Sequence, residues 1–299
     1  MKQQRTETSA SHARKELKVI EVIKVIKVMI KKIGIIAASG DLPKEILENC
    51  YEQGIETYYV NLRDIGNYQN PQIATKYIES KLTNVGKILN FLRENKVNKI
   101  IFAGGLKRPS FTSLIPDLKG MQLLARLQKL KKGGDNTIFK IIFKFLEEEG
   151  FEMAGVKDIA PALLTQQGVI GSVEPKMKQM RDVELAKDIA VEIGKMDIGQ
   201  AAVAHEGSIL GVEGIDGTDA LIKRCKTLHF KGKGGVLAKM KKPDQDDRID
   251  LPTIGIKTIR NLDENGFSGV VLEAGNSIIL NKSDVIDLAD ELGIFIYGV

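Results

Sequence analysis

Residues 33–43 read IGIIAASGDLP, and this stretch places the chain in the α/β class. Its first six residues form a short apolar run, which predicts a buried strand. The Ser-Gly-Asp that follows interrupts the run, and the proline suits the first turn of a helix that we predict over residues 42–52. Another strand is predicted over residues 55–60. A strand, a helix and a strand in this order predict a parallel sheet.

The same alternation continues through the first half of the chain. The further elements predicted there are a helix over residues 84–95, a strand over 99–103, a long helix over 135–149 and a strand over 151–155. The pattern predicts an N-terminal domain with a Rossmann-like parallel sheet.

Residues 159–175 contain two prolines and two glycines, and they break this alternation, so we place a domain boundary near Thr165. The elements predicted beyond it are helices over 182–193, 218–226 and 283–292, a hairpin of strands over 200–204 and 208–212, and strands over 235–239, 269–273, 277–280 and 294–297. We therefore expect a basic extension over residues 1–31, an N-terminal α/β domain over 32–165, and a C-terminal α/β domain with a mixed sheet and helices over 166–299.

The composition limits the classes of partner. Cys50 and Cys225 are the only cysteines, which argues against a disulfide framework and a cysteine-ligated metal and fits a reducing cytoplasm. The net charge of +5 comes largely from an excess of Lys and Arg in the first 32 residues. Tryptophan is absent and aromatic residues make up only 5% of the chain. A nucleic-acid partner is therefore not expected.

Residues 15–32 (KELKVIEVIKVIKVMIKK) place a charge at about every third position. They cannot form the uninterrupted apolar core of a signal peptide or a membrane span. A basic amphipathic helix of this kind can lie on an anionic membrane surface. The preferred interpretation is an extension outside the folded domain, upstream of a natural start at Met29.

Residues 244–255 (DQDDRIDLPTIG) hold four aspartates around Arg248. Carboxylates at this density repel one another unless a cation compensates them, and oxygen-only ligands favour a hard ion such as Mg²⁺. The loop therefore predicts chemistry on phosphate. A solvated acidic turn is the alternative.

Two glycine turns in the N-terminal domain could receive an anion. Gly40 lies at a strand-to-helix turn, where backbone N–H groups can bind phosphate. The turn lacks the G-x-G-x-x-G spacing, and Asn61 stands where a ribose-binding acid is expected, so a dinucleotide site is disfavoured. The turn after residues 99–103 adds Lys107 and Arg108, which could reach an anionic ligand or could simply be solvated.

The C-terminal domain carries more polar residues at predicted strand ends. Gln200 enters the first strand of the hairpin, and Glu213 follows the second. Thr218 and Asp219 then begin a helix, where helix capping is the alternative explanation for acidic residues. Arg224 lies on a different face of that helix from Asp219.

Lys239 ends the strand predicted over residues 235–239. It would point towards the acidic loop if the strands concerned are neighbours. Other catalytic constellations are poorly supported: His205 and His229 lack the spacing of a metal site, and there is no G-x-S-x-G or P-loop motif.

Together these segments resemble the LpxI family of UDP-2,3-diacylglucosamine pyrophosphatases, from about residue 30 onward. The segments that carry the resemblance are residues 33–43, 103–110 (AGGLKRPS), 197–200 (DIGQ), 213–219 with Arg224, and 236–255 (VLAKMKKPDQDDRIDLPTIG). The chain departs from the family at residues 37–39 (AAS), where the family usually has more glycine.

The resemblance implies two α/β domains, the C-terminal one catalytic, with a ligand chamber between them. It implies Mg²⁺-dependent hydrolysis of the acylated UDP-sugar to UMP and 2,3-diacylglucosamine 1-phosphate in lipid A biosynthesis. Asp250 is our candidate for the essential carboxylate, with Glu213 and Asp219 next, and Asp250 and Asp219 as metal ligands. The expected substrate-binding residues are Lys239, Arg248, Arg224, Gln200, Lys107, Arg108, Gly40 and Thr218.

A non-catalytic sugar-nucleotide or lipid-binding protein is the alternative from a different class. In that case the acidic loop is structural and the basic N-terminus docks on the membrane. A nicotinamide-dependent enzyme is disfavoured because the glycine fingerprint is missing. Peripheral association with the cytoplasmic face of the inner membrane and a homo-oligomer are both left open.

Overall fold

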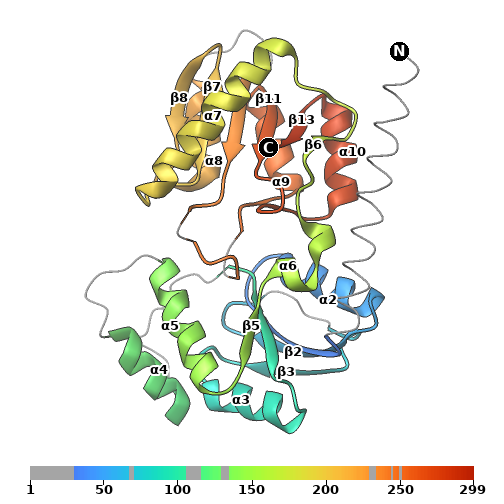
Figure 1. Ribbon diagram of the computed structural model, residues 1–299, viewed down its shortest axis with the longest axis vertical. Helices are drawn as coiled ribbons and strands as arrows, with labels where there is room; N and C mark the ends of the chain where they lie inside the picture. The colour runs from blue at the N-terminus through green and yellow to red at the C-terminus, as the bar shows by residue number, and fades with distance from the viewer. Residues whose placement is uncertain are drawn as a thin grey trace, which may run out of the picture. The chain divides into compact units, whose positions relative to one another are not determined.

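The computed structural model describes residues 30–66, 71–105, 116–128, 135–228, 234–243, 245–248 and 251–299. The chain forms two compact units, Met1–Pro161 and Ala162–Val299, called unit 1 and unit 2 below (Figure 1).

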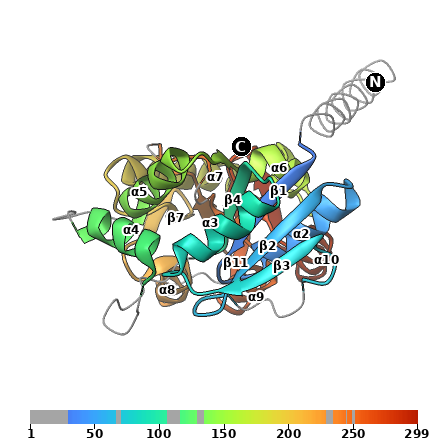
Figure 2. The same cartoon turned by 90° about the horizontal axis from the view of Figure 1, so that it is seen from below.

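Unit 1 is built on a five-stranded sheet in the order β3-β2-β1-β4-β5, and every pair in it is parallel. Figure 2 shows β3, β2, β1 and β4 of this sheet side by side. The strands are β1 (Lys32–Ala37), β2 (Glu56–Leu62), β3 (Lys76–Ser80), β4 (Lys99–Ala103) and β5 (Glu152–Ala154). The prediction of a Rossmann-like parallel sheet is confirmed.

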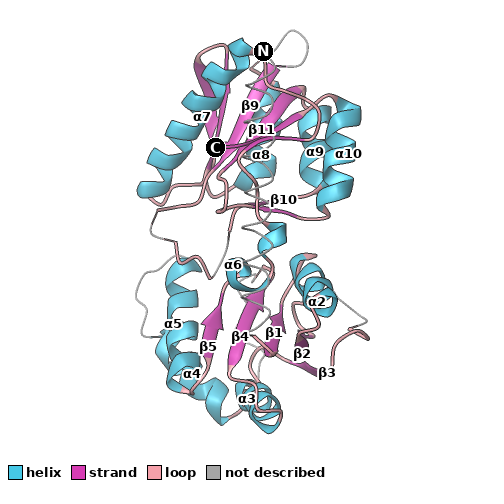
Figure 3. Ribbon diagram, turned by 45° about the vertical axis from the view of Figure 1, so that its right-hand side comes forward, coloured by secondary structure: helices cyan, strands magenta, loops and turns pink. Residues whose placement is uncertain are grey.

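The helices of unit 1 bury the apolar side chains of the sheet. They are α2 (Leu42–Glu52), α3 (Val85–Glu94), α4 (Leu118–Gln128), α5 (Asp135–Glu148) and the short α6 (Val156–Ile159) (Figure 3). Ile33, Ile35 and Tyr59 from the sheet and Ile46 and Phe143 from the helices are almost completely buried. The helix predicted over residues 42–52 has those bounds in the structure.

Three elements of unit 1 were not predicted: β3, α4 and the short α6. β3 is an edge strand in which only Ser80 is buried, so it lacks the apolar run of an internal strand. α4 buries only Gly120 and Leu123 among the residues of its span. A side chain at Gly120 would lie 2.1 Å from the carbonyl oxygen of Thr83, so glycine allows this helix to approach the loop after β3.

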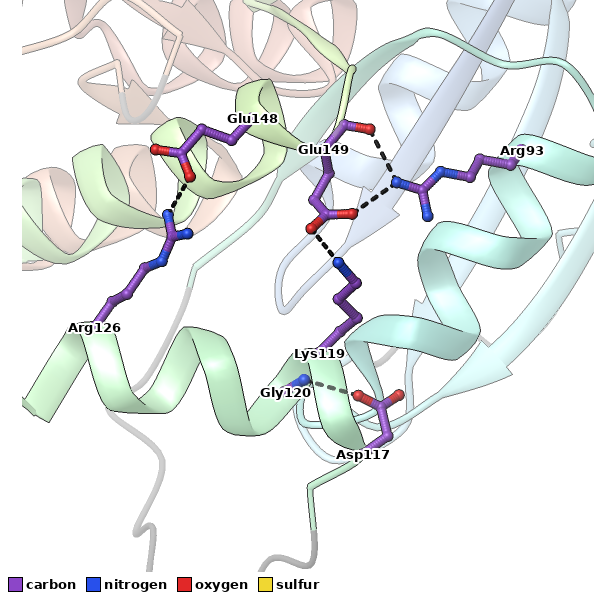
Figure 4. A network of polar contacts seen from close by, with 7 residues as sticks. All are labelled: Arg93, Asp117, Lys119, Gly120, Arg126, Glu148 and Glu149. Atoms are coloured by element: carbon purple, nitrogen blue, oxygen red, sulfur yellow. Dashed lines mark hydrogen bonds and ion pairs between the residues drawn. The ribbon is translucent and has the colours of Figure 1, made fainter.

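Asp117 and Glu149 connect the helices of unit 1 (Figure 4). One oxygen of Asp117 accepts the backbone N–H of Gly120 at 2.8 Å and the other accepts that of Lys87 at 3.2 Å, so one carboxylate serves the first turns of both α4 and α3.

The Glu149 carboxylate accepts hydrogen bonds from Arg93 at 2.7 Å and from Lys119 at 2.5 Å. Burial raises the pKa of Glu149, but the hydrogen bonds from Lys119 and Arg93 outweigh burial, so the pKa lies below its usual value. Arg126 and Glu148 pair at 2.6 Å between α4 and α5.

Unit 2 is built on a six-stranded mixed sheet in the order β6-β13-β11-β9-β7-β8. β13, β11 and β9 are parallel, β6 runs antiparallel to β13, and the hairpin β7–β8 is attached antiparallel to β9. The strands are β6 (Gly168–Ile170), β7 (Ala201–His205), β8 (Ser208–Val212), β9 (Gly234–Lys239), β11 (Phe267–Leu272) and β13 (Phe295–Gly298). The predictions of a mixed sheet and of the hairpin are confirmed.

Helices cover both faces of this sheet. Its helices are α7 (Met177–Lys195), α8 (Gly217–Lys226), α9 (Ile256–Glu264) and α10 (Lys282–Leu292). A 3-10 turn, η2 (Pro161–Leu163), includes the point in the sequence where the two units divide. One core groups Val183 of α7 with Ala202 and Val236 of the sheet. The second core groups residues of α8, α9 and α10 with Leu237 and Val270. Adjacent residues such as Val236 and Leu237 thus face opposite cores, as the alternation of a strand requires.

A small parallel sheet joins β10 (Thr253–Ile254) to β12 (Ile278–Ile279). The strand predicted over residues 277–280 therefore exists, but it pairs outside the main sheet. β6, β10 and α9 were not predicted: β6 and β10 are very short, and α9 buries only Ile259 and Leu262.

Candidate functional site

The carboxyl end of β9 brings together residues that are distant in the sequence. In the sheet, Lys239 lies opposite Ala201 of β7 on one side and opposite Leu272 of β11 on the other. Gln200 directly precedes β7, and Glu213 directly follows β8. The sheet register therefore gathers Gln200, Glu213 and Lys239 at one edge of unit 2, where open α/β sheets bind ligands.

Glu213 is buried at this edge, with 6% of its surface exposed. Its Oε2 accepts the backbone N–H of Gln200 at 2.8 Å, and its Oε1 accepts the hydroxyl of Thr218 at 2.5 Å. A side chain at Gly199 would lie 2.3 Å from the carbonyl oxygen of Glu213, so the chain passes very close at this point. The carboxylate thus joins the start of β7, the end of β8 and the start of α8. Its contacts are those of a residue that positions Gln200 and Thr218.

The two predicted residues of α8 make different contacts. Arg224 pairs with the carboxylate of Asp216 and also donates to the carbonyl oxygen of Val212, so its guanidinium lies at the end of β8. Asp219 is exposed, and its Oδ1 accepts a hydrogen bond from Asn261 of α9 at 3.1 Å. The carboxylate of Asp219 therefore links α8 to α9.

Lys239 joins the two ends of the loop between β9 and β10. Its Nζ donates to the carbonyl oxygen of Thr253 at 3.1 Å. The next residue, Met240, donates its backbone N–H to the carbonyl oxygen of Gln200 at 2.8 Å. The backbone after Lys239 is thereby held next to Gln200, while the Lys239 ammonium is held at Thr253.

The described aspartates of the acidic loop are compensated by cations of the same loop. Arg248 binds both carboxylate oxygens of Asp246, through Nε at 2.9 Å and Nη2 at 2.7 Å. Asp247 pairs with the ammonium of Lys241. For these two residues, Arg248 and Lys241 supply the compensating positive charge that the crowding of carboxylates requires. Asp244 and Asp250 lie outside the described residues.

Sequence reasoning missed Glu273, which directly follows β11. Its carboxylate accepts the backbone N–H of Lys241 at 3.0 Å and the side-chain amide of Asn276 at 2.6 Å. The signal that could have found it is an acidic residue at the carboxyl end of a parallel strand beside β9.

At the carboxyl edge of the sheet in unit 1, hydrogen bonds join the turn after β1 to the turn after β4. Ser39 and Gly105 exchange backbone hydrogen bonds at 3.3 and 2.9 Å, and the Ser39 hydroxyl donates to the carbonyl oxygen of Gly105 at 2.7 Å. Gly104 has a φ of +94°, and a side chain there would lie 2.3 Å from the carbonyl oxygen of Ser39. Gly40 has a φ of +95° at the start of α2. Lys107 and Arg108 lie outside the described residues.

The described residues contain no group of three or more His, Cys, Asp or Glu side chains that could hold a metal ion. Within the same part of the chain, no helix is both long enough and apolar enough to cross a membrane.

Comparison with protein families gives two adjacent matches. Residues 32–163 match the LpxI N-terminal domain, and residues 166–297 match the LpxI C-terminal domain. The chain is also 36% identical over 278 residues to the UDP-2,3-diacylglucosamine pyrophosphatase LpxI of Caulobacter vibrioides. That similarity covers 90% of this chain and 98% of the Caulobacter protein.

Two of the solved structures to which the chain is similar are distant from it. A biotin carboxylase domain of Hydrogenobacter thermophilus 2-oxoglutarate carboxylase is 17% identical with a TM-score of 0.26, covering 60% of this chain and 36% of that one. An isoflavone reductase is 11% identical with a TM-score of 0.28, covering 91% and 78% of the two chains. At these scores neither similarity carries an argument about function.

Proposed function

The chain belongs to the LpxI family, and on this premise we propose that it hydrolyses the diphosphate of UDP-2,3-diacylglucosamine in lipid A biosynthesis. The products would be UMP and 2,3-diacylglucosamine 1-phosphate. The observation that carries the proposal is the similarity to the Caulobacter enzyme along nearly its whole length.

The edge around Lys239 supports this chemistry. Hydrolysis of a phosphoric anhydride develops negative charge on phosphoryl oxygens, and a fixed cation in a partly buried site stabilises that charge. Lys239 is half-buried and held by Thr253. We propose that it binds the diphosphate, and that Gln200 and Thr218 contact the substrate beside it. Glu213 would act by holding these two residues in place.

The remaining residues proposed to bind the substrate are two arginines of unit 2 and three residues of unit 1. Arg224 and Arg248 are paired with Asp216 and Asp246, so either would bring a partly neutralised charge to the substrate. Gly40, Lys107 and Arg108 of unit 1 remain proposals for substrate binding.

We propose that the reaction uses Mg²⁺, with Asp250 and Asp219 as the residues that hold it. Carboxylate oxygens are the donors that this ion prefers. The described residues do not assemble a ligand set by themselves, so the proposal depends on Asp250. A bound Mg²⁺ would supply Lewis acidity towards a phosphoryl oxygen or a water molecule.

The test is to incubate the purified protein with UDP-2,3-diacylglucosamine and Mg²⁺ and to measure UMP. We expect UMP release that stops on chelation and that is lost in a folded Asp250→Asn variant. Undiminished turnover after chelation would remove the metal from the mechanism, and wild-type turnover in Asp250→Asn would remove that residue. Binding of the substrate without any UMP would favour a non-catalytic binding protein.

We also propose that the enzyme works in the cytoplasm, at the inner face of the inner membrane, because its proposed substrate carries acyl chains. Sedimentation with anionic vesicles tests this. A variant that lacks residues 1–28 then shows whether the basic extension is needed for the association.

A further inference from the structure

The loop that follows β9 is attached to the neighbouring strand β11 through one carboxylate. Glu273, directly after β11, is half-buried, and its Oε2 accepts the backbone N–H of Lys241 at 3.0 Å. Its Oε1 accepts the side-chain amide of Asn276 at 2.6 Å, which fixes the orientation of the carboxylate. Because β9 and β11 are parallel neighbours, this contact fixes the backbone two residues beyond Lys239.

Lys241 also contacts the acidic loop through its side chain. Its ammonium pairs with the carboxylate of Asp247, and only 15% of the Lys241 side chain is exposed. Asp246 in turn accepts both the backbone N–H of Arg248 at 3.0 Å and its guanidinium. The contacts therefore run from β11 through Glu273 and Lys241 to Asp247.

The same contacts also place the proposed diphosphate-binding cation. Lys239 directly precedes two residues whose backbone N–H groups are held on opposite sides: that of Met240 donates to the carbonyl oxygen of Gln200, and that of Lys241 donates to Glu273. A carboxylate that accepts a backbone N–H forms a charge-assisted hydrogen bond, which is stronger than a neutral one. Loss of the Glu273 carboxylate would leave the start of the loop after β9 attached at Gln200 but no longer at β11.

We propose that Glu273 is a positioning residue, which holds the Lys241 amide and thereby sets the acidic loop and Lys239 for the reaction. This inference rests on the proposed function. Glu273 is not expected to contact the substrate, so its loss should lower kcat more than it raises KM.

The experiment compares Glu273→Ala with the full-length wild-type protein. We expect kcat for UMP release to fall about 10- to 100-fold, since small displacements of catalytic groups have effects of this size. KM should rise by a smaller factor than kcat falls, because Glu273 itself makes no contact with the substrate. Glu273→Gln keeps one acceptor oxygen for the Lys241 amide, so it should recover much of the lost kcat. Glu291→Ala, at an exposed site on α10, is the matched control and should behave as wild type.

Residue-resolved amide hydrogen exchange provides a readout that does not depend on activity. In Glu273→Ala the Lys241 amide should exchange faster, while the Met240 amide, bonded to Gln200, should keep its protection. If Glu273→Ala does not fold, Glu273→Gln serves both measurements, with a smaller expected change. An unchanged Lys241 exchange rate, or a wild-type kcat in a variant with faster exchange, would overturn the inference.

The two proposals fail in different ways. If the wild-type protein releases no UMP, the proposed function is wrong, and the exchange rates alone decide whether Glu273 holds the loop. If the wild-type protein is active and Glu273→Ala is equally active, only the positioning role is wrong.

Discussion

The ammonium of Lys239 donates a hydrogen bond to the carbonyl oxygen of Thr253, 3.1 Å away, and this contact closes the loop that carries the acidic residues. Lys239→Met keeps most of the side-chain volume but removes the charge and the donor. We expect UMP release to fall at least about tenfold, because a cation that stabilises developing phosphoryl charge is lost. Steady-state kinetics measure this effect. Lys223→Met, which removes an exposed lysine from α8, is the control, and equal activity of the two variants would contradict the role of Lys239.

Glu213 should contribute strongly to the stability of unit 2. Glu213→Ala leaves the Gln200 N–H and the Thr218 hydroxyl without their acceptor in a buried site. Removing the partner of hydrogen bonds to a charged group costs about 1.5–3 kcal/mol, so the free energy of unfolding in urea should fall by that order. Glu174→Ala, at an exposed position, should change it little. A Glu213→Ala protein as stable as Glu174→Ala would show that the carboxylate is not a structural link.

The stability of unit 1 should depend on acid through Glu149. The pKa of its carboxyl group in the folded protein lies below the ordinary value of 4.5, with burial opposed by stronger hydrogen bonds from Lys119 and Arg93. A lowered folded-state pKa stabilises the fold above the unfolded-state pKa, and this contribution is lost as the pH falls through the folded-state value. The difference in urea midpoint between wild type and Glu149→Gln should therefore be present at neutral pH and shrink as the pH falls below 4.5. A difference that stays constant with pH would contradict this assignment.

Gly104→Ala should destabilise unit 1 more than Gly150→Ala. Both glycines have a φ near +90°, at +94° and +91°, so the two variants share the backbone penalty of a left-handed alanine. At Gly104 the new methyl group would also lie 2.3 Å from the carbonyl oxygen of Ser39, whereas at Gly150 it meets nothing within 4 Å. We expect Gly104→Ala to lose about 1–3 kcal/mol more than the control in thermal or urea unfolding, as overpacking does. Equal losses would show that the Ser39–Gly105 bridge adjusts freely.

Helices and strands that bury a run of apolar residues could be predicted from the sequence. Elements that bury few residues could not be predicted. β1 and β4 each bury four or more of their residues, and both were predicted within one residue of their bounds. β3 and α4 place few residues in the core, so the periodicity on which prediction depends is weak there.

The positions of Gln200, Glu213 and Lys239 at strand ends could be predicted from sequence, but the contacts that join them could not. Gln200, Glu213 and Lys239 stand at predicted strand ends, yet their proximity depends on the order of β8, β7 and β9, which strand periodicity does not specify. Glu273 directly follows β11 in the sequence, but its carboxylate contacts the loop after β9. The pairing of Asp246 with Arg248 similarly depends on how the loop backbone turns.

The strand order of unit 2 also has a consequence for how the chain is made. β13 is the last strand in sequence, yet it lies between β6 and β11 in the sheet. During translation, β6 has no partner until residues 295–298 have left the ribosome, whereas the five strands of unit 1 are complete at residue 154. Because domains generally fold as units and the N-terminal one first, unit 1 should fold while its successor is still being synthesised.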